Sequence, residues 1–238
     1  YHNQVTRVEG PFSLRMFQRT WGIMFIQANI SAPCHLLDFP TLARFIKEIR
    51  RKQYDIVGIT SILPNLGKVQ KMCELIRHYQ PDARIVIGGH IANKSDLHEH
   101  VRADHIVRGD GIRWFRLFLG EDEHQPIRHP LIVSGFGARA MGLPLSSKLR
   151  DTAATLVPSV GCPMGCNFCS TSWMFGGRGK CIHFYETGEE LFDVMCQLEE
   201  KMKVRSFFVM DENFLLHKKR ALRLLELMKE KNRAYVEG

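Results

Sequence analysis

The sequence lacks several features that would assign it to other classes of protein. It contains no run of about 18 apolar residues, so we expect no membrane-spanning helix. Residues 1–20 do not show the basic-then-apolar order of a secretory signal peptide. No repeats or low-complexity tracts occur, and the seven cysteines are an odd number spread over 238 residues, which argues against a disulfide framework. We therefore expect a cytoplasmic protein in a reducing compartment.

Charge and composition narrow the remaining classes. Lys and Arg number 33 against 25 Asp and Glu, which gives a net charge of +8. The excess is dispersed, and its densest run, Arg44 to Lys52, lies on the polar side of an expected helix. A nucleic-acid surface would show clustered charge with exposed aromatic residues, so we expect no nucleic-acid partner. Apolar residues form 45% of the chain, which is enough for a hydrophobic core.

The most informative stretch holds three cysteines, Cys162, Cys166 and Cys169, in the order Cys-Pro-Met-Gly-Cys-Asn-Phe-Cys. An expected strand, Ala154 to Val160, runs directly into them. Three thiolates that converge on one point can hold three irons of a 4Fe-4S cluster and leave the fourth iron without a protein ligand. An iron with such an open position can bind a substrate or a cofactor.

Structural zinc is the alternative metal for these cysteines. Zinc sites of this kind need four ligands and commonly use two Cys-x-x-Cys pairs, whereas only one pair here has that spacing. The candidates for a fourth ligand are Cys181, His183 and Cys196.

The three-cysteine segment, with Phe168 just before the last cysteine and a strand before the first, resembles the cluster loop of radical S-adenosylmethionine enzymes. The resemblance implies that Cys162, Cys166 and Cys169 are the cluster ligands. It also implies that S-adenosylmethionine chelates the open iron and is cleaved to a 5′-deoxyadenosyl radical, with the backbone around Phe168 touching the adenine.

The residues after the cysteines predict one turn of a β/α barrel. Thr187 to Lys203 has apolar residues at helical spacing, and Arg205 to Met210 is typical of a buried strand. That strand ends in Asp211, Glu212 and Asn213, where barrel folds place their chemistry. In the family this strand end faces the amino group of S-adenosylmethionine, and the other role for an Asp or Asn here is to cap the helix that begins near His217.

The part before the cysteines predicts a different module with alternating strands and helices. The expected strands are Trp21 to Ile30, Tyr54 to Ile62, Ala83 to Gly88 and His105 to Val107, and the expected helices are Phe39 to Arg51, Gly67 to Tyr79, Ser95 to Val101 and Ile112 to Leu119. Continuous apolar strands that alternate with helices indicate a parallel sheet covered on both faces. Ligands of such sheets bind beyond the carboxyl ends of the strands.

The loops at those strand ends carry small and polar residues, namely Thr60, Ser61, Gly88, Gly89, His90, Gly109, Asp110 and Gly111. Small residues there allow a ligand to approach the backbone closely. Together the segments Asp-Ile-Val-Gly-Ile-Thr-Ser, Ile-Val-Ile-Gly-Gly-His and Ile-Val-Arg-Gly-Asp-Gly resemble the cobalamin-binding domain found upstream of many radical S-adenosylmethionine barrels. The resemblance implies that these eight residues contact cobalamin, although His90 can equally cap the next helix.

Two departures from that family are visible. The Asp-x-His-x-x-Gly motif of proteins that ligate cobalt from below is absent, since Asp96-Leu97-His98 is followed by Val101 instead of Gly. The family domain also begins with one more strand–helix unit, which residues 1–20 do not supply.

The sequence thus predicts an α/β protein: a Rossmann-like (flavodoxin-like) parallel-sheet domain followed by the first part of a radical S-adenosylmethionine β/α barrel. The expected parts are an N-terminal extension (1–20), the cobalamin-binding-like domain (21–120), a linker (121–150) and a truncated barrel (151–238), with Ala234-Tyr235-Val236 opening a third barrel strand. Because a barrel of this family has about six strand–helix units, we expect the chain to be a fragment.

The expected reaction is cobalamin-dependent methylation of an unactivated carbon, with a 4Fe-4S cluster, S-adenosylmethionine and cobalamin as cofactors. The expected partners are a small-molecule or peptide substrate and an electron donor such as flavodoxin or ferredoxin. Radical cyclisation or rearrangement and a non-catalytic metal- or cluster-binding module are the alternatives.

Overall fold

A computed structural model describes residues 12–17, 20–140, 143–145 and 153–237. The chain divides into two compact units, each assembled from segments that are separate in sequence. Unit 1 comprises residues 20–128 and 161–182, and the described part of unit 2 comprises residues 12–17, 129–140, 143–145, 153–160 and 183–237. None of the described helices is long and apolar enough to cross a membrane.

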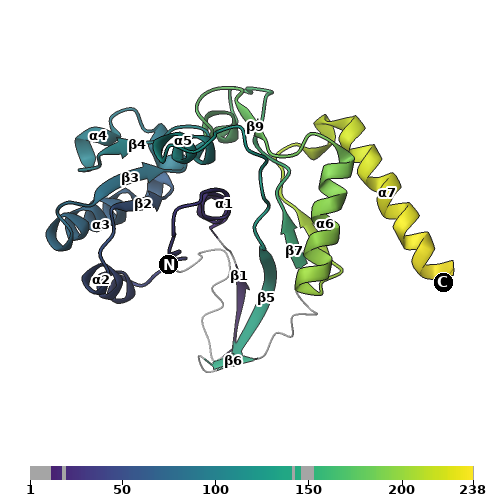
Figure 1. The fold of residues 1–238 in the computed structure, drawn as a ribbon, viewed down its shortest axis with the longest axis horizontal. Coiled ribbons are helices and arrows are strands. Elements are labelled where there is room, and N and C mark those ends of the chain that lie inside the picture. Colours follow the sequence, from purple (N-terminus) through teal and green to yellow (C-terminus); the bar gives the residue numbers. More distant parts are fainter. Residues whose placement is uncertain (1–11, 18–19, 141–142, 146–152, 238) are drawn as a thin grey trace. The chain divides into compact units, whose positions relative to one another are not determined.

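Unit 1 is built on a parallel sheet of three strands in the order β2 (Ile56–Thr60), β3 (Arg84–Gly88) and β4 (His105–Ile106) (Figure 1). Thr60 pairs with Gly88, so the carboxyl ends of β2 and β3 are level with each other. The sequence predictions of these three strands and of the parallel sheet are confirmed.

One face of this sheet is covered by α2 (Leu42–Arg51) and α3 (Leu66–Tyr79). Phe45 and Ile49 from α2 and Ile76 from α3 are buried in one cluster with Ile85 and Ile87 of β3. Because side chains alternate along a strand, Ile85 and Ile87 share this face. The two helices were predicted, as were α4 (Leu97–His100) and α5 (Gly111–Phe118).

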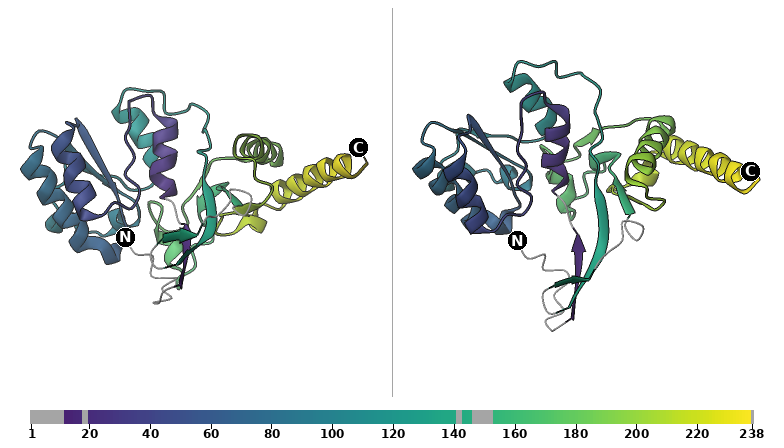
Figure 2. Two further views of the ribbon diagram at one scale, coloured as in Figure 1. Left: turned by 90° about the horizontal axis from the view of Figure 1, so that it is seen from below. Right: turned by 60° about the horizontal axis from the view of Figure 1, so that its bottom comes forward.

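The first predicted strand of this unit is wrong, because Trp21–Asn29 forms the helix α1. Helices α1 and α5 lie side by side (Figure 2). The phenyl ring of Phe115 in α5 lies 3.7 Å from where a Cβ at Gly58 would stand, so α5 covers the sheet face opposite α2 and α3. A short apolar run does not distinguish a strand from a buried helix by its periodicity.

Unit 2 contains a sheet in the order β1 (Phe12–Phe17), β5 (Val133–Ala140), β7 (Ala153–Leu156) and β10 (Phe207–Val209). β1 and β5 pair antiparallel along the whole of β1, and β6 (Leu143–Leu145) pairs with β5 on a separate branch. These strands occupy segments that the sequence assigned to an extension and a linker, because their apolar residues are interrupted by Gly, Arg and Pro.

β7, the helix α6 (Gly188–Met202) and β10 form one strand–helix–strand unit with parallel strands (Figure 1). Leu191, Leu198 and Leu224 are buried against Ala154 and Leu156 of β7. Helix α6 begins with a capping box, in which Thr187 accepts from the Glu190 N–H and Glu190 accepts from the Thr187 N–H.

Helix α7 (Lys218–Glu237) packs against α6 and continues through the residues that were predicted to open a third strand. That prediction is wrong, since no Gly or Pro separates Ala234, Tyr235 and Val236 from the preceding helix. The chain passes between the two units through β8 (Ser159–Gly161) and β9 (Cys181–His183), which pair as a two-stranded sheet.

Candidate functional site

The loops that follow β2 and β3 meet at the carboxyl edge of the parallel sheet. The Ser61 N–H donates to the Gly88 carbonyl at 3.3 Å, and the Ile91 N–H donates to the Ser61 carbonyl at 3.1 Å. The sequence-predicted residues Thr60, Ser61, Gly88 and Gly89 are therefore brought together. Ile62 and Leu63, which come next after this edge, are 45% and 54% exposed, and sequence reasoning did not select them.

Gly89 is required by the protein itself at this edge. Its φ is +79°, and a Cβ there would stand 2.5 Å from Thr60 Oγ1 and 2.9 Å from the Ser61 carbonyl oxygen. The glycine thus allows two loops to approach each other, whereas the sequence analysis gave it the role of admitting a ligand.

The main role of the loop after β4 is to cap the helix α5. Asp110 Oδ1 accepts from the Ile112 N–H at 2.9 Å and from the Arg113 N–H at 3.1 Å, so the carboxylate caps α5. Gly111 lies against the side chain of Ile26 in α1. Asp110 and Gly111 therefore position α5. Gly109 has a different neighbour, the segment with Phe175 and Gly176.

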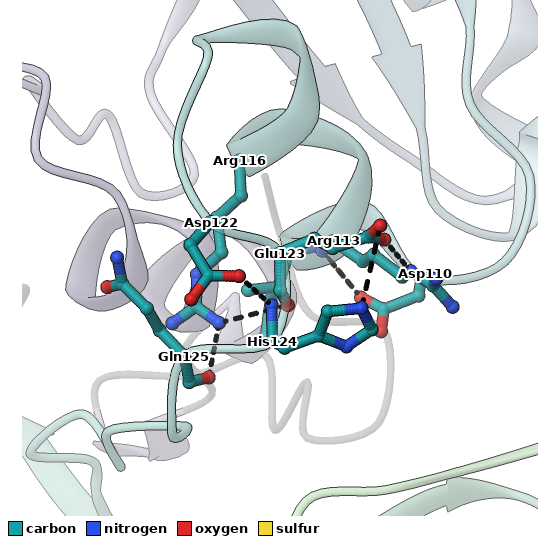
Figure 3. A network of polar contacts seen from close by, with 8 residues as sticks. Asp110, Arg113, Arg116, Asp122, Glu123, His124 and Gln125 are labelled. Carbon is teal, nitrogen blue, oxygen red and sulfur yellow. Dashed lines mark hydrogen bonds and ion pairs between the residues drawn. The ribbon is translucent and has the colours of Figure 1, made fainter.

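A buried arginine of α5, Arg116, lies in a network of polar contacts with the residues that follow the helix (Figure 3). Arg116 is 2% exposed and donates only to uncharged oxygens: the Asn29 carbonyl and side-chain Oδ1, and the carbonyls of Glu123, Gln125 and Pro126. These bonds tie the end of α1 and the segment after α5 to one guanidinium. Sequence reasoning missed Arg116, and its place among apolar residues in Ile112 to Leu119 is the only signal of its burial.

His90 begins the short 3₁₀ helix His90–Asn93 that follows β3. Its ring meets the edge of the Phe175 ring with 5.4 Å between centroids. Burial lowers the pKa of His90, so the imidazole is neutral at pH 7 and can act as a donor or an acceptor to a ligand.

The three cysteines follow β8 in a loop that belongs to unit 1, and each is partly exposed. The Cys169 N–H donates to the Cys166 carbonyl at 3.2 Å, and the Cys181 thiol donates to the Gly161 carbonyl at 3.5 Å. All seven cysteines lie in described parts of the chain, and none of them forms a disulfide. The Phe168 ring is 93% exposed and is thus accessible to a ligand.

Three thiols within eight residues are the donor set of an iron–sulfur cluster. Among the residues that the structure describes, however, no group of three or more Cys, His, Asp or Glu side chains is positioned to hold a metal ion. The three thiols have the right chemistry for an iron–sulfur cluster, but the structure does not bring them together around one point. Cys196, a candidate fourth zinc ligand, lies on α6 and accepts from Lys231 Nζ at 3.5 Å.

In unit 2 the acidic residue at the end of β10 is already engaged. Asp211 Oδ2 accepts from Ser159 Oγ at 2.5 Å and from Arg220 at 3.0 Å, and Oδ1 accepts from the Asn213 N–H at 2.8 Å. The side chains of Asp211 and Arg220 are 3% and 2% exposed. Arg220 also donates to the Tyr185 carbonyl, so Asp211 joins β8, β10 and α7.

The neighbours of Asp211 differ in exposure. Glu212 is exposed and Asn213 is half-buried at the N-cap of a 3₁₀ helix without a side-chain cap bond. The His183 and His217 rings lie 4.6 Å apart, and burial, with the charges of Arg220 and His183, lowers the pKa of His217. Sequence reasoning missed Ser159 and Arg220; a serine inside an apolar strand was the available signal for the first.

Comparison with known proteins bears on unit 1 in particular. Residues 19–118 match the B12 binding domain family. This family has a flavodoxin-like α/β fold with a parallel sheet, in agreement with β2, β3 and β4. The match supports the sequence prediction of cobalamin as a cofactor.

One relative has a name that includes an activity. The chain is 26% identical over 213 residues to the uncharacterized methyltransferase PH0819 of Pyrococcus horikoshii. The aligned region covers 78% of this chain and 45% of the relative, so the chain spans less than half of the relative's length.

Proposed function

We propose that residues 19–118 bind cobalamin at the carboxyl edge of β2, β3 and β4, and that the chain is part of a cobalamin-dependent radical S-adenosylmethionine methyltransferase. The observation that carries the proposal is that the three-cysteine loop belongs to the same compact unit as the cobalamin-type sheet. A methyl donor and a radical source must act on one carbon, so their binding sites need to be neighbours.

The roles of individual residues follow from their chemistry. Cys162, Cys166 and Cys169 would hold a 4Fe-4S cluster, and the exposed Phe168 would adjoin the adenine of S-adenosylmethionine. Backbone groups at Thr60, Ser61 and Gly88 would meet the polar parts of cobalamin, and the exposed Ile62 and Leu63 offer an apolar surface to the corrin. When bound, the cofactors would supply the radical and the methyl group, while the protein orients them.

We propose different roles for Asp211 than for Glu212 and Asn213. Asp211 is held by Ser159 and Arg220, so it would support the strand end instead of meeting the cofactor. Glu212 is exposed and Asn213 is half-buried, and by the family resemblance these two would meet the amino group of S-adenosylmethionine. The substrate, a small molecule or a peptide, and an electron donor such as flavodoxin or ferredoxin complete the proposal.

The cluster is tested by anaerobic reconstitution with iron and sulfide. We expect an electron paramagnetic resonance signal of a reduced 4Fe-4S cluster that shifts when S-adenosylmethionine is added. The Cys166→Ala variant should lose this signal, while Cys73→Ala, which changes a buried cysteine of the α3 core, should keep it. Retained zinc without iron would favour a non-catalytic metal module and would refute the radical proposal.

Cobalamin binding is tested separately by gel filtration of the protein after incubation with hydroxocobalamin. We expect cobalamin absorbance to elute with the protein. If none is retained, the methyl-transfer proposal fails, and a radical cyclisation or rearrangement becomes the reaction to test with the reconstituted cluster.

A further inference from the structure

A short segment after the third cysteine makes contact with two loops at the edge of the parallel sheet. We call this segment, Trp173 to Gly176, the tether. It lies in unit 1 together with the sheet and with the three cysteines. The family match ends at residue 118, so it assigns no role to this segment.

The first contact is a hydrogen bond to the loop after β3. Asn93 Nδ2 donates to the Met174 carbonyl at 2.7 Å and more weakly to its own loop at the His90 carbonyl, 3.4 Å away. Asn93 is half-buried, so this bond is partly shielded from competing water. A side-chain amide thus fixes the backbone of the tether across a gap of 81 residues in sequence.

The second contact links the same loop to the entrance of the cysteine loop. The Phe175 ring meets the His90 ring in an edge-to-face arrangement with 5.4 Å between centroids. On its other side, Phe175 Cδ2 lies 3.1 Å from where a Cβ of Gly161 would stand, directly before Cys162. One ring therefore connects the sheet edge with the residue that precedes the first cysteine.

The third contact is a close approach of two glycines. Gly176 has a φ of +92°, and a Cβ on it would stand 3.2 Å from Gly109 Cα in the loop after β4. Beneath this contact, Arg108 Nε donates to the Ala92 carbonyl at 2.7 Å, so the loops after β3 and β4 are fixed to each other. The tether thus rests on a rigid base formed by two loops of the cobalamin-type sheet.

We infer that the tether couples occupancy of the sheet edge to the order of the three-cysteine loop. Cobalamin bound at this edge would pack against Met174 and Phe175 and hold the tether in place, and the cysteines on the same loop would become more ordered as a result. The ligand in this inference rests on the proposed function, whereas the tether itself is a property of the protein without cofactors.

The tether is tested by hydrogen–deuterium exchange of the full chain, monitored by mass spectrometry on peptides that cover residues 162–181. Asn93→Ala removes the hydrogen bond to the Met174 carbonyl, and loss of this partly shielded bond should make exchange in these peptides about threefold to tenfold faster. Gly176→Ala places a Cβ 3.2 Å from Gly109 Cα, which should push the two loops apart and also make exchange faster.

Two matched controls isolate the contacts. Asn232→Ala removes an exposed asparagine on α7. Gly120→Ala introduces a side chain at a similar positive φ of +74° with no atom within 4 Å, so it carries the backbone strain without the contact. Exchange in the cysteine-loop peptides should stay at the wild-type rate in both controls, and equal rates in the tether variants and the controls would overturn the tether.

The coupling is tested by repeating the exchange with hydroxocobalamin. In the wild type we expect exchange of these peptides to slow at least about threefold, and in Asn93→Ala this slowing should be largely lost although cobalamin absorbance is still retained. Equal slowing in the variant would overturn the coupling. If the wild type retains no cobalamin, the proposed cobalamin site and the coupling both fail, while the exchange rates without cofactor still decide whether the tether exists.

Discussion

Arg116 connects the end of α1 with the segment that follows α5. Its guanidinium is buried and donates to five carbonyl-type oxygens from Asn29 and the segment 123–126. If the guanidinium were removed, each of these oxygens would lose a hydrogen bond, although Asn29 Oδ1 would keep a second donor, the Arg128 N–H at 2.8 Å. Buried acceptors without partners are costly. The end of α1, the end of α5 and the chain leaving α5 would all be affected.

The variant Arg116→Met keeps much of the side-chain volume and removes every one of these bonds. We expect it to lower the free energy of unfolding by at least about 3 kcal/mol. Urea unfolding followed by circular dichroism measures the effect. Arg102→Met, at an exposed arginine of the same unit, serves as the control and should change stability by less than about 0.5 kcal/mol.

His129 of unit 2 should make stability depend on pH. Its Nε2 accepts from the Val157 N–H at 3.0 Å and its Nδ1 donates to the Pro130 carbonyl at 2.7 Å, which fixes the neutral form. Burial lowers the pKa of His129 from 6.5 to about 4. The unfolded chain therefore binds a proton between these two pH values while the folded protein does not.

Stability from His129 should be fully present above pH 6.5 and should be lost progressively as the pH falls to about 4. The loss attributable to this group is about 3 kcal/mol at the acid end. Unfolding free energies measured between pH 7.5 and 4.5 in the wild type and in His129→Gln test this. Identical pH dependence in the two proteins would show that His129 is not the responsible group.

At the scale of elements, the close packing of α6 and α7 depends on the absence of a side chain at Gly188. A Cβ at this position would stand 2.7 Å from Arg223 Cβ and from the Leu224 N atom, and 2.9 Å from the Arg220 carbonyl. Most of these atoms are backbone or the base of a side chain, so they cannot move without a shift of the helix. The arginine that binds Asp211 lies on the same turn of α7.

Replacement of Gly188 by Ala should therefore force α6 and α7 apart and lower the free energy of unfolding by about 1–3 kcal/mol. Gly22→Ala in α1 is the matched control, because nothing lies within 4 Å of its added Cβ. That control should be neutral or slightly stabilising, since Ala favours a helix over Gly. Thermal unfolding of the two variants compares them, and an equal loss in both would contradict the packing argument.

Sequence patterns predict elements well where a continuous apolar run or a helical spacing of apolar residues is clear. The strand Ile56–Thr60 and the helix Leu66–Tyr79 follow from such patterns. Trp21–Asn29 was predicted as a strand because it is a short and largely apolar run, and it is a helix that packs against α5. β1 and β5 were missed because their pairing joins residues more than one hundred positions apart, which no local pattern reveals.

Some features of the candidate site could be predicted from the sequence, and others could not. The loops at the sheet edge could be predicted, because parallel strands place their carboxyl ends together. The roles inside those loops were not predicted. Asp110 caps α5 through a local hydrogen bond, and the role of Gly89 depends on how closely the Thr60 side chain approaches it from another loop. Arg220 was also missed, since nothing on α7 indicates which of its basic residues is buried.

At the scale of the whole molecule, the two compact units are interleaved along the chain. Unit 1 receives its cysteine loop from residues 161–182, after β7 and the first two residues of β8 have been contributed to unit 2. A division of the sequence into consecutive domains at residues 120 and 150 does not describe this arrangement. The cysteine loop is therefore expected to depend on unit 1 for its order, although the strand that precedes it belongs to unit 2.

The sheet edge should bind cobalamin without the cluster. Cys166 lies in the loop and not at the strand ends, so we expect Cys166→Ala to lose its reconstituted iron and keep cobalamin through gel filtration. Iron content and cobalamin absorbance measured on the same fractions distinguish the two sites. Loss of both in this variant, with unchanged circular dichroism, would mean that the two sites are not separable.

The hydrogen bonds of Arg116 do not depend on pH in the acid range. Carbonyl oxygens neither gain nor lose a proton in water, and a guanidinium keeps its charge throughout the range in which carboxylates are neutralised. The bonds that Arg116 makes at the junction of α1, α5 and the segment 123–126 therefore persist in acid. They should remain when the ion pair of Arg113 with Glu123 at the same junction, and that of Arg77 with Asp104, are lost to protonation.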